Sequence, residues 1–445
     1  MRSYLMRKVM PNLLILLSLL ALPYEQNTGD LTHSIVAAAA ATTASKNESG
    51  VTSGPVVGEQ EKDCITYDGH QKAIRVSCKS PTHLTEIYNK LGRGDVLAKE
   101  GPLQRQSAAV WLLNASIIVD NDAALIIDSK DTSWLKIVAD GKTENSIQVS
   151  GSLRIDSVKI TSWDPAKNYY AIDHGTRELY VDKSGTGMPR PYILVKVAAT
   201  GTTDITNSEL AYLGYKCIGG KCSGIRYFGG DGSTIRGNNI HHNGFGFYSN
   251  GVANILYEDN EVHHNTMYGI DPHTGTHDMI IRNNTVHDNG SIGIVCAQDC
   301  NKITIENNVV HNNTKAGILF SSNMYNSTAT NNTISNETTG ISIFNSHNNK
   351  IYNNTISNVK NGIKLTGNMS SHNIIDNNII KKATDLGILV RPSAFGNTFY
   401  SNIIINATGD GGNRATTTPI QNGSLTSGSS NMGKNNDNIS GEDVT

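Results

Sequence analysis

The sequence of 445 residues is short of charged side chains and has almost no excess of either sign. Asp, Glu, Lys and Arg together make up 17% of the chain, and the formal net charge is −2. A nucleic-acid-binding protein would carry a clear basic excess, so this class is disfavoured. Coiled coils and ordinary helical bundles are richer in charge, so the composition also argues against an all-helical chain.

Long hydrophobic runs are also missing, except at the N-terminus. Arg2, Arg7 and Lys8 precede an apolar segment at residues 13–22. The segment is too short to span a membrane and has the layout of a signal peptide. We therefore expect residues 1–23 to direct export, so that the protein is secreted, periplasmic or on the cell surface. A retained N-terminal anchor is the alternative.

The six cysteines fall into three pairs of near neighbours. An even number of cysteines in an exported chain indicates disulfide bonds. None of the pairs has the C-x-x-C spacing of a zinc site, so a metal site is the less favoured reading. The predicted disulfides are Cys64–Cys78, Cys217–Cys222 and Cys296–Cys300.

Asparagine is in excess, and it is periodic. Residues 231–410 hold 34 asparagines. One series of asparagines recurs at intervals of 22–24 residues, and a series of glycines recurs at intervals of 22–25 residues. A constant period of this length is typical of a solenoid. The asparagines are Asn238, Asn260, Asn284, Asn308, Asn332, Asn354, Asn378 and Asn402; the glycines are Gly246, Gly269, Gly293, Gly317, Gly340, Gly362 and Gly387.

The residues between these markers predict strands. Apolar, mostly β-branched residues stand one and three positions after most of the glycines, so they share one face of a strand. No stretch has the helical spacing of apolar residues. We predict an all-β parallel β-helix with turns of 22–25 residues. Stacked asparagines would bond one another at the corners, where asparagine also tolerates a left-handed backbone.

The chain divides by composition into four parts. We expect a low-complexity linker at residues 24–60, a β-helix domain at residues 61–408 and a flexible Gly/Asn/Ser/Thr-rich tail at residues 409–445, after the signal peptide at residues 1–23. Alternating segments between residues 111 and 160 fit the first turns. A helical segment at residues 82–91 would cap the open end of the solenoid.

One turn of the repeat carries side chains of a catalytic type. The positions two and four after each glycine face outward, and most of them hold unremarkable residues. In one turn they hold Asp271 and His273, on either side of Pro272, which breaks the strand pattern. A local rule broken beside reactive side chains suggests a functional site. Tyr248 should lie one turn away from Asp271.

The segment Tyr268-Gly-Ile-Asp-Pro-His273 resembles the YG(F/I)DPH motif of the mannuronan (alginate) C-5 epimerases, especially the exported β-helix type. Further landmarks of that family follow in order over most of residues 80–400, including Arg190-Pro-Tyr and Gly246-Phe-Tyr. Thr274 stands where the family usually has an acidic residue, and Ser291-Ile292 stand where it tends to be basic. The resemblance implies a right-handed parallel β-helix that acts on a polyuronate.

The reaction removes the C5 proton of a uronate and returns a proton to the opposite face of the ring. A group must neutralise the sugar carboxylate, because abstraction adds negative charge. The resemblance implies that His273 and Tyr268 are the acid–base pair and that Asp271 either holds the carboxylate through a shared proton or orients the neighbouring cation. Which of the two is the base is left open, and so is the cation; Arg236, Arg282 and Lys302 are candidates. We expect the substrate to contact Tyr248, Asn250, His264, Arg282, Gln298 and Asp299.

A column of histidines recurs three positions after the asparagines, at His241, His263, His287 and His311. Stacked imidazoles can bind a transition metal, but a solvated ladder is the simpler interpretation. The sequence has no Gly-rich nonapeptide calcium repeat. We predict no cofactor and no metal.

Three functions remain in competition. The first is a polyuronate C-5 epimerase, and the second is a polysaccharide lyase, which would follow the same abstraction with β-elimination. The third is a carbohydrate-binding solenoid without catalysis. The expected partner is a polyuronate or another acidic polysaccharide. Nucleic acid and a membrane span beyond the signal segment are not expected, and the oligomeric state is left open.

Overall fold

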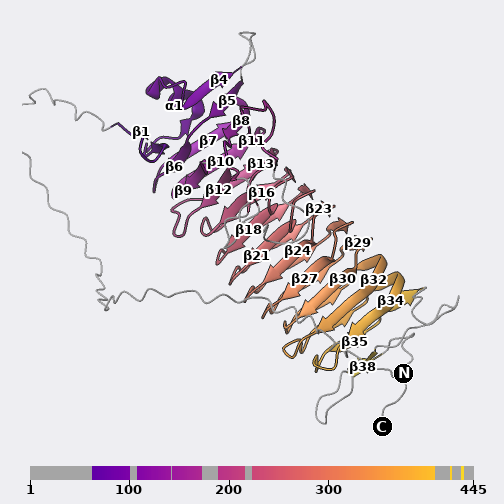
Figure 1. Ribbon diagram of the computed structural model, residues 1–445. Coiled ribbons are helices and arrows are strands. Elements are labelled where there is room, and N and C mark those ends of the chain that lie inside the picture. Colours follow the sequence, from indigo (N-terminus) through magenta and orange to yellow (C-terminus); the bar gives the residue numbers. More distant parts are fainter. Residues whose placement is uncertain are drawn as a thin grey trace, which may run out of the picture. The chain divides into compact units, whose positions relative to one another are not determined.

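The structure is a computed structural model that describes residues 63–100, 108–141, 143–172, 189–215, 223–405, 421–422 and 432–434. The chain divides into two units, Met1–Gln60 and Glu61–Thr445. Within the second unit, short strands stack in parallel from turn to turn (Figure 1). Each regular turn contributes three strands, so the strands form three columns. The predicted parallel β-helix is confirmed.

The β21 column contains the strand of the predicted site. Its strands pair in parallel and in chain order. They are β2 (Ala73–Val76), β6 (Ser116–Val119), β9 (Ser146–Val149), β12 (Tyr192–Val195), β15 (Ile225–Tyr227), β18 (Phe247–Asn250), β21 (Ile270–His273), β24 (Ile292–Ala297), β27 (Ala316–Ser321), β30 (Thr339–Phe344), the C-terminal halves of β32 (Thr355–Thr366) and β34 (Ile379–Val390), and β37 (Gln421–Asn422).

The β20 column precedes the β21 column in each turn and belongs to the same sheet. Its outward positions carry the predicted histidine series. Its strands are β4 (Leu97–Glu100), β5 (Ala109–Leu113), β8 (Thr132–Val138), β11 (Lys159–Trp163), β14 (Glu209–Ala211), β17 (Asn239–His241), β20 (Glu261–His263), β23 (Thr285–His287), β26 (Val309–His311), β29 (Thr333–Ser335), the N-terminal halves of β32 and β34, and β36 (Ile403–Ile405).

The β22 column forms a second sheet. Its strands are β3 (Thr82–His83), β7 (Ala124–Asp128), β10 (Ser152–Asp156), β13 (Thr203–Thr206), β16 (Thr234–Arg236), β19 (Leu256–Glu258), β22 (Ile280–Arg282), β25 (Thr304–Glu306), β28 (Thr328–Thr330), β31 (Lys350–Tyr352), β33 (Ile374–Asp376), β35 (Thr398–Tyr400) and β38 (Met432–Lys434). The core lies between the three columns and consists of stacked Ile, Val and Leu side chains.

The predicted asparagine series forms a continuous ladder inside the solenoid. Asn308 Nδ2 donates to Asn332 Oδ1 at 2.9 Å, and Asn308 Oδ1 accepts from the backbone N and from Nδ2 of Asn284, both at 3.0 Å. Each asparagine is therefore buried with its polar atoms bonded. The left-handed corner residue is not the ladder asparagine but the residue before it: Asn283 and Asn307 have φ values of 56° and 55°. The expected corner role thus belongs to the preceding position.

Two further ladders were not anticipated from the sequence. One runs through Asn243, Asn265, Asn289 and Asn313 and ends at Glu337, whose Oε1 accepts from Asn313 Nδ2 at 2.8 Å. The other links Asn349, Asn373 and Asn397. Together the ladders satisfy the buried backbone at the corners, where strand pairing stops.

The periodic glycines mark the place where successive turns approach most closely. A Cβ added at Gly269 would lie 2.6 Å from the Gly293 carbonyl oxygen and 2.7 Å from Val286 Cγ1. A side chain has no room at this position, and the same is true of the other periodic glycines from Gly246 to Gly387.

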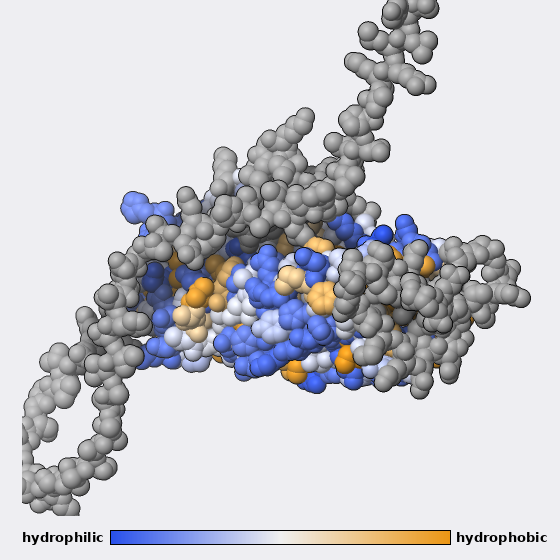
Figure 2. Space-filling model, turned by 90° about the horizontal axis from the view of Figure 1, so that it is seen from below, coloured by the Kyte–Doolittle hydropathy of each residue, from blue (hydrophilic) through white to orange (hydrophobic). Residues whose placement is uncertain are grey.

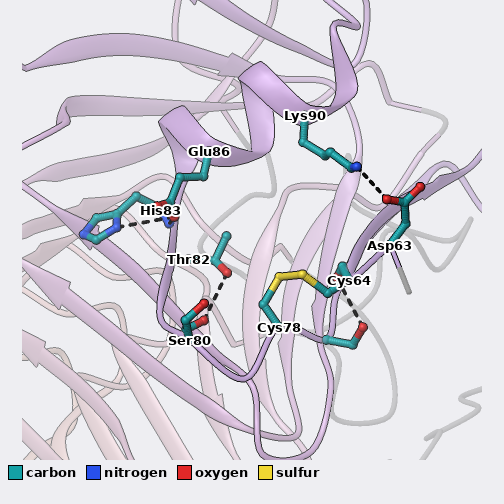
Figure 3. The surroundings of a disulfide bond; sticks show 9 residues. Asp63, Cys64, Cys78, Ser80, Thr82, His83, Glu86 and Lys90 are labelled. Atoms are coloured by element: carbon teal, nitrogen blue, oxygen red, sulfur yellow. Dashed lines mark hydrogen bonds and ion pairs between the residues drawn. A yellow bond between two sulfur atoms is a disulfide. The ribbon is translucent and has the colours of Figure 1, made fainter. Parts of the chain in front are cut away.

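The N-terminal end of the described solenoid is built differently. Strand β1 (Ile65–Asp68) pairs antiparallel with β2, and β4 pairs antiparallel with β5. The predicted helix is present as α1 (Leu84–Leu91), which ends at Gly92 with φ 59°. His83 N donates to Glu86 Oε2 at 2.7 Å at the start of the helix, and Lys90 pairs with Asp63 at 2.5 Å at its end (Figure 3).

The face of the molecule seen in Figure 2 is mostly hydrophilic, and its hydrophobic residues occur in small, separate patches. Among the described residues, no helix has the length and apolar character needed to cross a membrane.

Candidate active site on the outer face of strand β21

Strand β21 brings the predicted site residues into register with the previous turn. Tyr248 pairs with Asp271, and Asn250 pairs with His273. On the other side, β21 pairs with β24 only at its two ends, through Ile270–Ile294 and His273–Ala297. Pro272 has no N–H to donate, so it interrupts the ladder between those ends.

Asp271 is buried, although the sequence suggested an outward carboxylate beside an outward imidazole. Its side chain is 2% exposed, and its Oδ1 has no hydrogen-bond partner in the part of the chain that the structure describes. Burial raises the pKa of Asp271 well above its ordinary value. Burial therefore favours the neutral carboxylic acid, because a lone charge without a partner is costly in such a site.

His273 is held by a short relay of hydrogen bonds. Its Nδ1 lies 2.6 Å from Thr274 Oγ1, and that hydroxyl donates to Gln298 Oε1 at 3.1 Å. A hydroxyl has one proton, so His273 Nδ1 must donate to Thr274, and Nε2 then keeps its lone pair. Burial lowers the pKa of His273, which favours the neutral ring. The relay thus prepares Nε2 to accept a proton.

Tyr248 lies beside the imidazole on the previous turn. The ring centroids of Tyr248 and His273 are 5.6 Å apart, and Asn250 Nδ2 donates to the Tyr248 hydroxyl at 3.4 Å. Burial raises the pKa of Tyr248, so its phenol stays protonated at neutral pH. The structure thus brings Tyr248, Asn250, Asp271, His273 and Gln298 together.

Tyr268 precedes Gly269 and packs on the outer face of the β21 column. Its ring lies 5.1 Å from that of Phe245, and it covers a cluster of buried apolar residues on β24 and β27. The phenol is therefore attached to the same face as Asp271 and His273, at the start of strand β21.

Other predicted contact residues lie farther from this group or are engaged elsewhere. Arg282 is on β22, in the second sheet and not in the sheet of β21, and its Nε donates to Glu258 Oε2 at 2.6 Å. His264 follows β20, with its Nδ1 2.7 Å from His263 Nδ1. Asp299 follows β24, and its Oδ1 accepts from Asn323 Nδ2 at 2.6 Å.

The other two candidate cations also have carboxylate partners outside the site. Arg236 lies 3.2 Å from Asp259, and Lys302 lies 3.6 Å from Asp278.

Reasoning from the sequence missed Arg226, which pairs in register with Tyr248 and is 5% exposed. Its guanidinium stands 4.1 Å above the Tyr192 ring. The sequence could have indicated Arg226, because it occupies the outward position of the strand two turns before Asp271.

The cysteine predictions have mixed outcomes. Cys64 and Cys78 form a disulfide close to helix α1 (Figure 3). Cys296 and Cys300 are free and buried, so the predicted bond between them is wrong. Cys296 points into the core from β24, while Cys300 Sγ donates to the Ala297 carbonyl oxygen at 3.0 Å. Cys217 and Cys222 lie outside the described residues.

The histidine column is a stacked ladder. The rings of His241, His263, His287 and His311 follow one another at centroid distances of 4.9–5.0 Å. The Nε2 atoms of His241, His263 and His287 face oxygen atoms of the preceding turn; His263 Nε2, for example, lies 3.0 Å from Asn239 Oδ1. Within the described ranges, no group of three His, Cys, Asp or Glu residues is arranged to hold a metal ion.

Comparison with known proteins identifies the fold family. The model of the right-handed β-helix region matches residues 194–325 and 274–439, which together cover more than half of the chain. The chain belongs to the right-handed β-helix family. This assignment also fixes the handedness of the solenoid. No curated protein sequence matched.

Solved structures of two epimerases share this β-helix fold. The periplasmic alginate epimerase AlgG has 20% sequence identity, covers 75% of this chain and 78% of its own, and gives a TM-score of 0.60. The A-module of the Azotobacter vinelandii mannuronan C-5 epimerase AlgE6 has 15% identity, covers 67% and 84%, and gives a TM-score of 0.50. Identities this low show a shared fold and no more.

Proposed function

We propose that the protein is a polyuronate C-5 epimerase and that strand β21 carries its active site. The observation that carries the proposal is a buried Asp271 carboxyl two positions before His273 on strand β21, where the bond from Nδ1 to Thr274 leaves the lone pair of the neutral ring on Nε2. The resemblance of Tyr268–His273 to the motif of the mannuronan C-5 epimerases supports it. The fold is also that of two solved epimerases.

The first requirement of the reaction is to neutralise the uronate carboxylate. A neutral Asp271 can donate its proton to that carboxylate in a short hydrogen bond, which stabilises the charge that builds up when the C5 proton leaves. Its Oδ1, which lacks a partner among the described residues, supports this role. A buried polar atom without a partner calls for a functional explanation.

The second requirement is a base on one face of the sugar and an acid on the other. In our proposal His273 Nε2 takes the C5 proton and becomes an imidazolium, while the Tyr268 phenol donates a proton to the opposite face. Tyr248 packs against the imidazole and positions it. The proton on His273 then returns to the Tyr268 phenolate through solvent, which completes the cycle without net consumption of protons.

We further propose the organisation predicted from the sequence. Residues 1–23 are the export signal, residues 24–60 a linker, residues 61–408 the catalytic domain with its N-terminal cap, and residues 409–445 a tail. Export to the periplasm, the cell surface or the medium agrees with the Cys64–Cys78 disulfide, since such bonds persist in oxidising compartments. It also agrees with the periplasmic location in the name of the similar AlgG structure.

The test is to incubate the protein with polymannuronate in D₂O. An epimerase incorporates deuterium at C5 with no fall in viscosity and no ultraviolet absorbance from an unsaturated uronate. A lyase would produce that absorbance and lower the viscosity. A binding protein would cause no deuterium incorporation, no absorbance and no change in viscosity. The absence of deuterium incorporation would exclude the proposal for this substrate.

A further inference from the structure

The outer face of the β21 column changes character at the proposed site. On the N-terminal side, the position of Asp271 is held by Tyr248 and then Arg226. On the C-terminal side, it is held by Val295 and then Leu319. One flank of the site therefore carries polar and cationic groups, whereas the other flank is apolar.

The apolar flank forms a separate cluster outside the main core. Its inner members are between 4% and 8% exposed, and Tyr268 and Leu319 pack over them and remain partly exposed. In the described strands β24 and β27, which follow β21 in this column (Figure 1), no residue is charged. We call this cluster the apolar outer patch: Tyr268, Ile292, Val295, Ala297, Ala316 and Leu319.

Charged residues lie only at the ends of these strands. Lys315 is exposed and directly precedes β27, while Asp299 is exposed and follows β24. A carboxylate seated on the patch would lose water and gain no partner from β24 or β27, which is unfavourable. The Asp299 carboxylate would add repulsion at one end. A sugar ring without a charge suits this surface, because the C–H faces of pyranoses pack well on aromatic and aliphatic side chains.

We propose that the apolar outer patch binds an uncharged sugar residue, next to the uronate that lies over Asp271 and His273. This inference rests on the proposed function. Successive turns are spaced by about 4.8 Å, which is close to the advance of one residue along an extended glycan. The inference narrows the proposed substrate class, because the preferred substrate is then a polyuronate interrupted by neutral sugars.

The test compares polymannuronate with the same polymer after partial reduction of its carboxyl groups, which converts a fraction of the uronates to neutral mannose. With the full chain, we expect the reduced polymer to bind about tenfold more tightly per remaining uronate. Deuterium incorporation at C5 per uronate should rise by a similar factor. Equal or tighter binding of unreduced polymannuronate would overturn the inference.

Leu319→Lys tests the patch itself. Leu319, Ser342 and Lys364 occupy the same outward position on successive turns, so this position of the strand accommodates lysine. The Leu319→Lys variant should lose the preference for the reduced polymer, whereas the matched control Ser342→Lys should keep it. An unchanged preference in the Leu319→Lys variant would count against the patch.

Lys315→Gln tests the main competing explanation. If Lys315 instead holds a second carboxylate over the patch, this variant will selectively lose binding to polymannuronate, and the inference is wrong. We expect its preference to match that of the wild-type protein.

The two proposals fail in different ways. A binding preference for the reduced polymer without any C5 exchange would reject the epimerase and keep the patch. Exchange without the preference would reject the patch and keep the epimerase.

Discussion

Asn284, at the corner between strands β22 and β23, and Asp271, in strand β21, are two buried polar residues that differ in how their polar atoms are bonded. Asn284 is 1% exposed; it donates to Asn308 and Tyr257 and accepts from Asn260. Asp271 is 2% exposed, and its Oδ1 has no partner among the described residues. The ladder residue contributes to stability, because its bonds are made within the chain. Asp271 leaves its Oδ1 available for a hydrogen bond to a substrate.

Asp271→Asn gives the largest expected effect. The variant keeps the shape of the side chain and removes the acidic proton, so it turns the site residue into one like its ladder neighbours. Turnover should fall about 1,000-fold, because one group that stabilises developing charge is lost, while the melting temperature should stay the same or rise. Deuterium incorporation and thermal unfolding measure the two effects.

Ser342→Ala is the matched control, since Ser342 occupies the equivalent outward position three turns later and should leave turnover intact. Activity retained in the Asp271→Asn variant would remove Asp271 from the mechanism.

Asn308→Ala changes a ladder residue and should therefore affect stability and not turnover. The variant loses the Asn308 bonds to Ile281 O and Asn332 and leaves Asn284 donors unbonded in the core. We expect the unfolding free energy to fall by about 2–4 kcal/mol, with little change in turnover per folded molecule. Denaturant titration measures the loss. Asn368→Ala, at an exposed position, is the control and should be nearly neutral; a similar loss there would contradict the ladder's role.

Gly269→Ala tests the close contact between turns. A methyl group at Gly269 would meet Gly293 O and Val286 Cγ1 well inside van der Waals contact, so we expect a loss of about 1–3 kcal/mol. Gly94→Ala is the comparison, because no atom lies within 4 Å of a Cβ at that position. Equal thermal stability of the two variants would show that the turns have room to adjust.

Glu337→Gln gives the smallest expected effect, which is a change in how the folding stability depends on pH. Glu337 ends an asparagine ladder, and burial raises its pKa from 4.5 to about 8. The folded state keeps this proton while the unfolded state releases it, so stability should decline as the pH rises from 4.5 towards 8. Glu337→Gln should flatten that part of the stability–pH profile. An unchanged slope in the variant would place the pH dependence elsewhere.

The periodic features of the fold were predictable from the sequence. The spacing of Gly269 and Gly293 predicted stacked strands, and the Asn284 series predicted a ladder, because any repeat must place equivalent residues in register. The Tyr248–Asp271 register followed from the same spacing. What the spacing did not reveal is which neighbour of each ladder asparagine takes the left-handed conformation.

The site was less predictable, because its properties depend on what covers each side chain. Alternation places Asp271 outward but does not indicate that it is buried. The hydroxyl of Thr274 links His273 to Gln298 across a turn, and such a contact has no periodic signal. Arg282 was predicted in the site, but its strand lies in the second sheet, paired with Glu258.

The most direct measurement is the nuclear magnetic resonance signal of C5 deuterium in a uronate polymer incubated with the full chain in D₂O. We predict incorporation by the wild-type protein, at unchanged polymer length, and its loss in the His273→Ala and Asp271→Asn variants. Incorporation that persists in both variants would contradict the assignment of the site to strand β21. Absence of incorporation from polymannuronate and from its partially reduced form would contradict the epimerase itself.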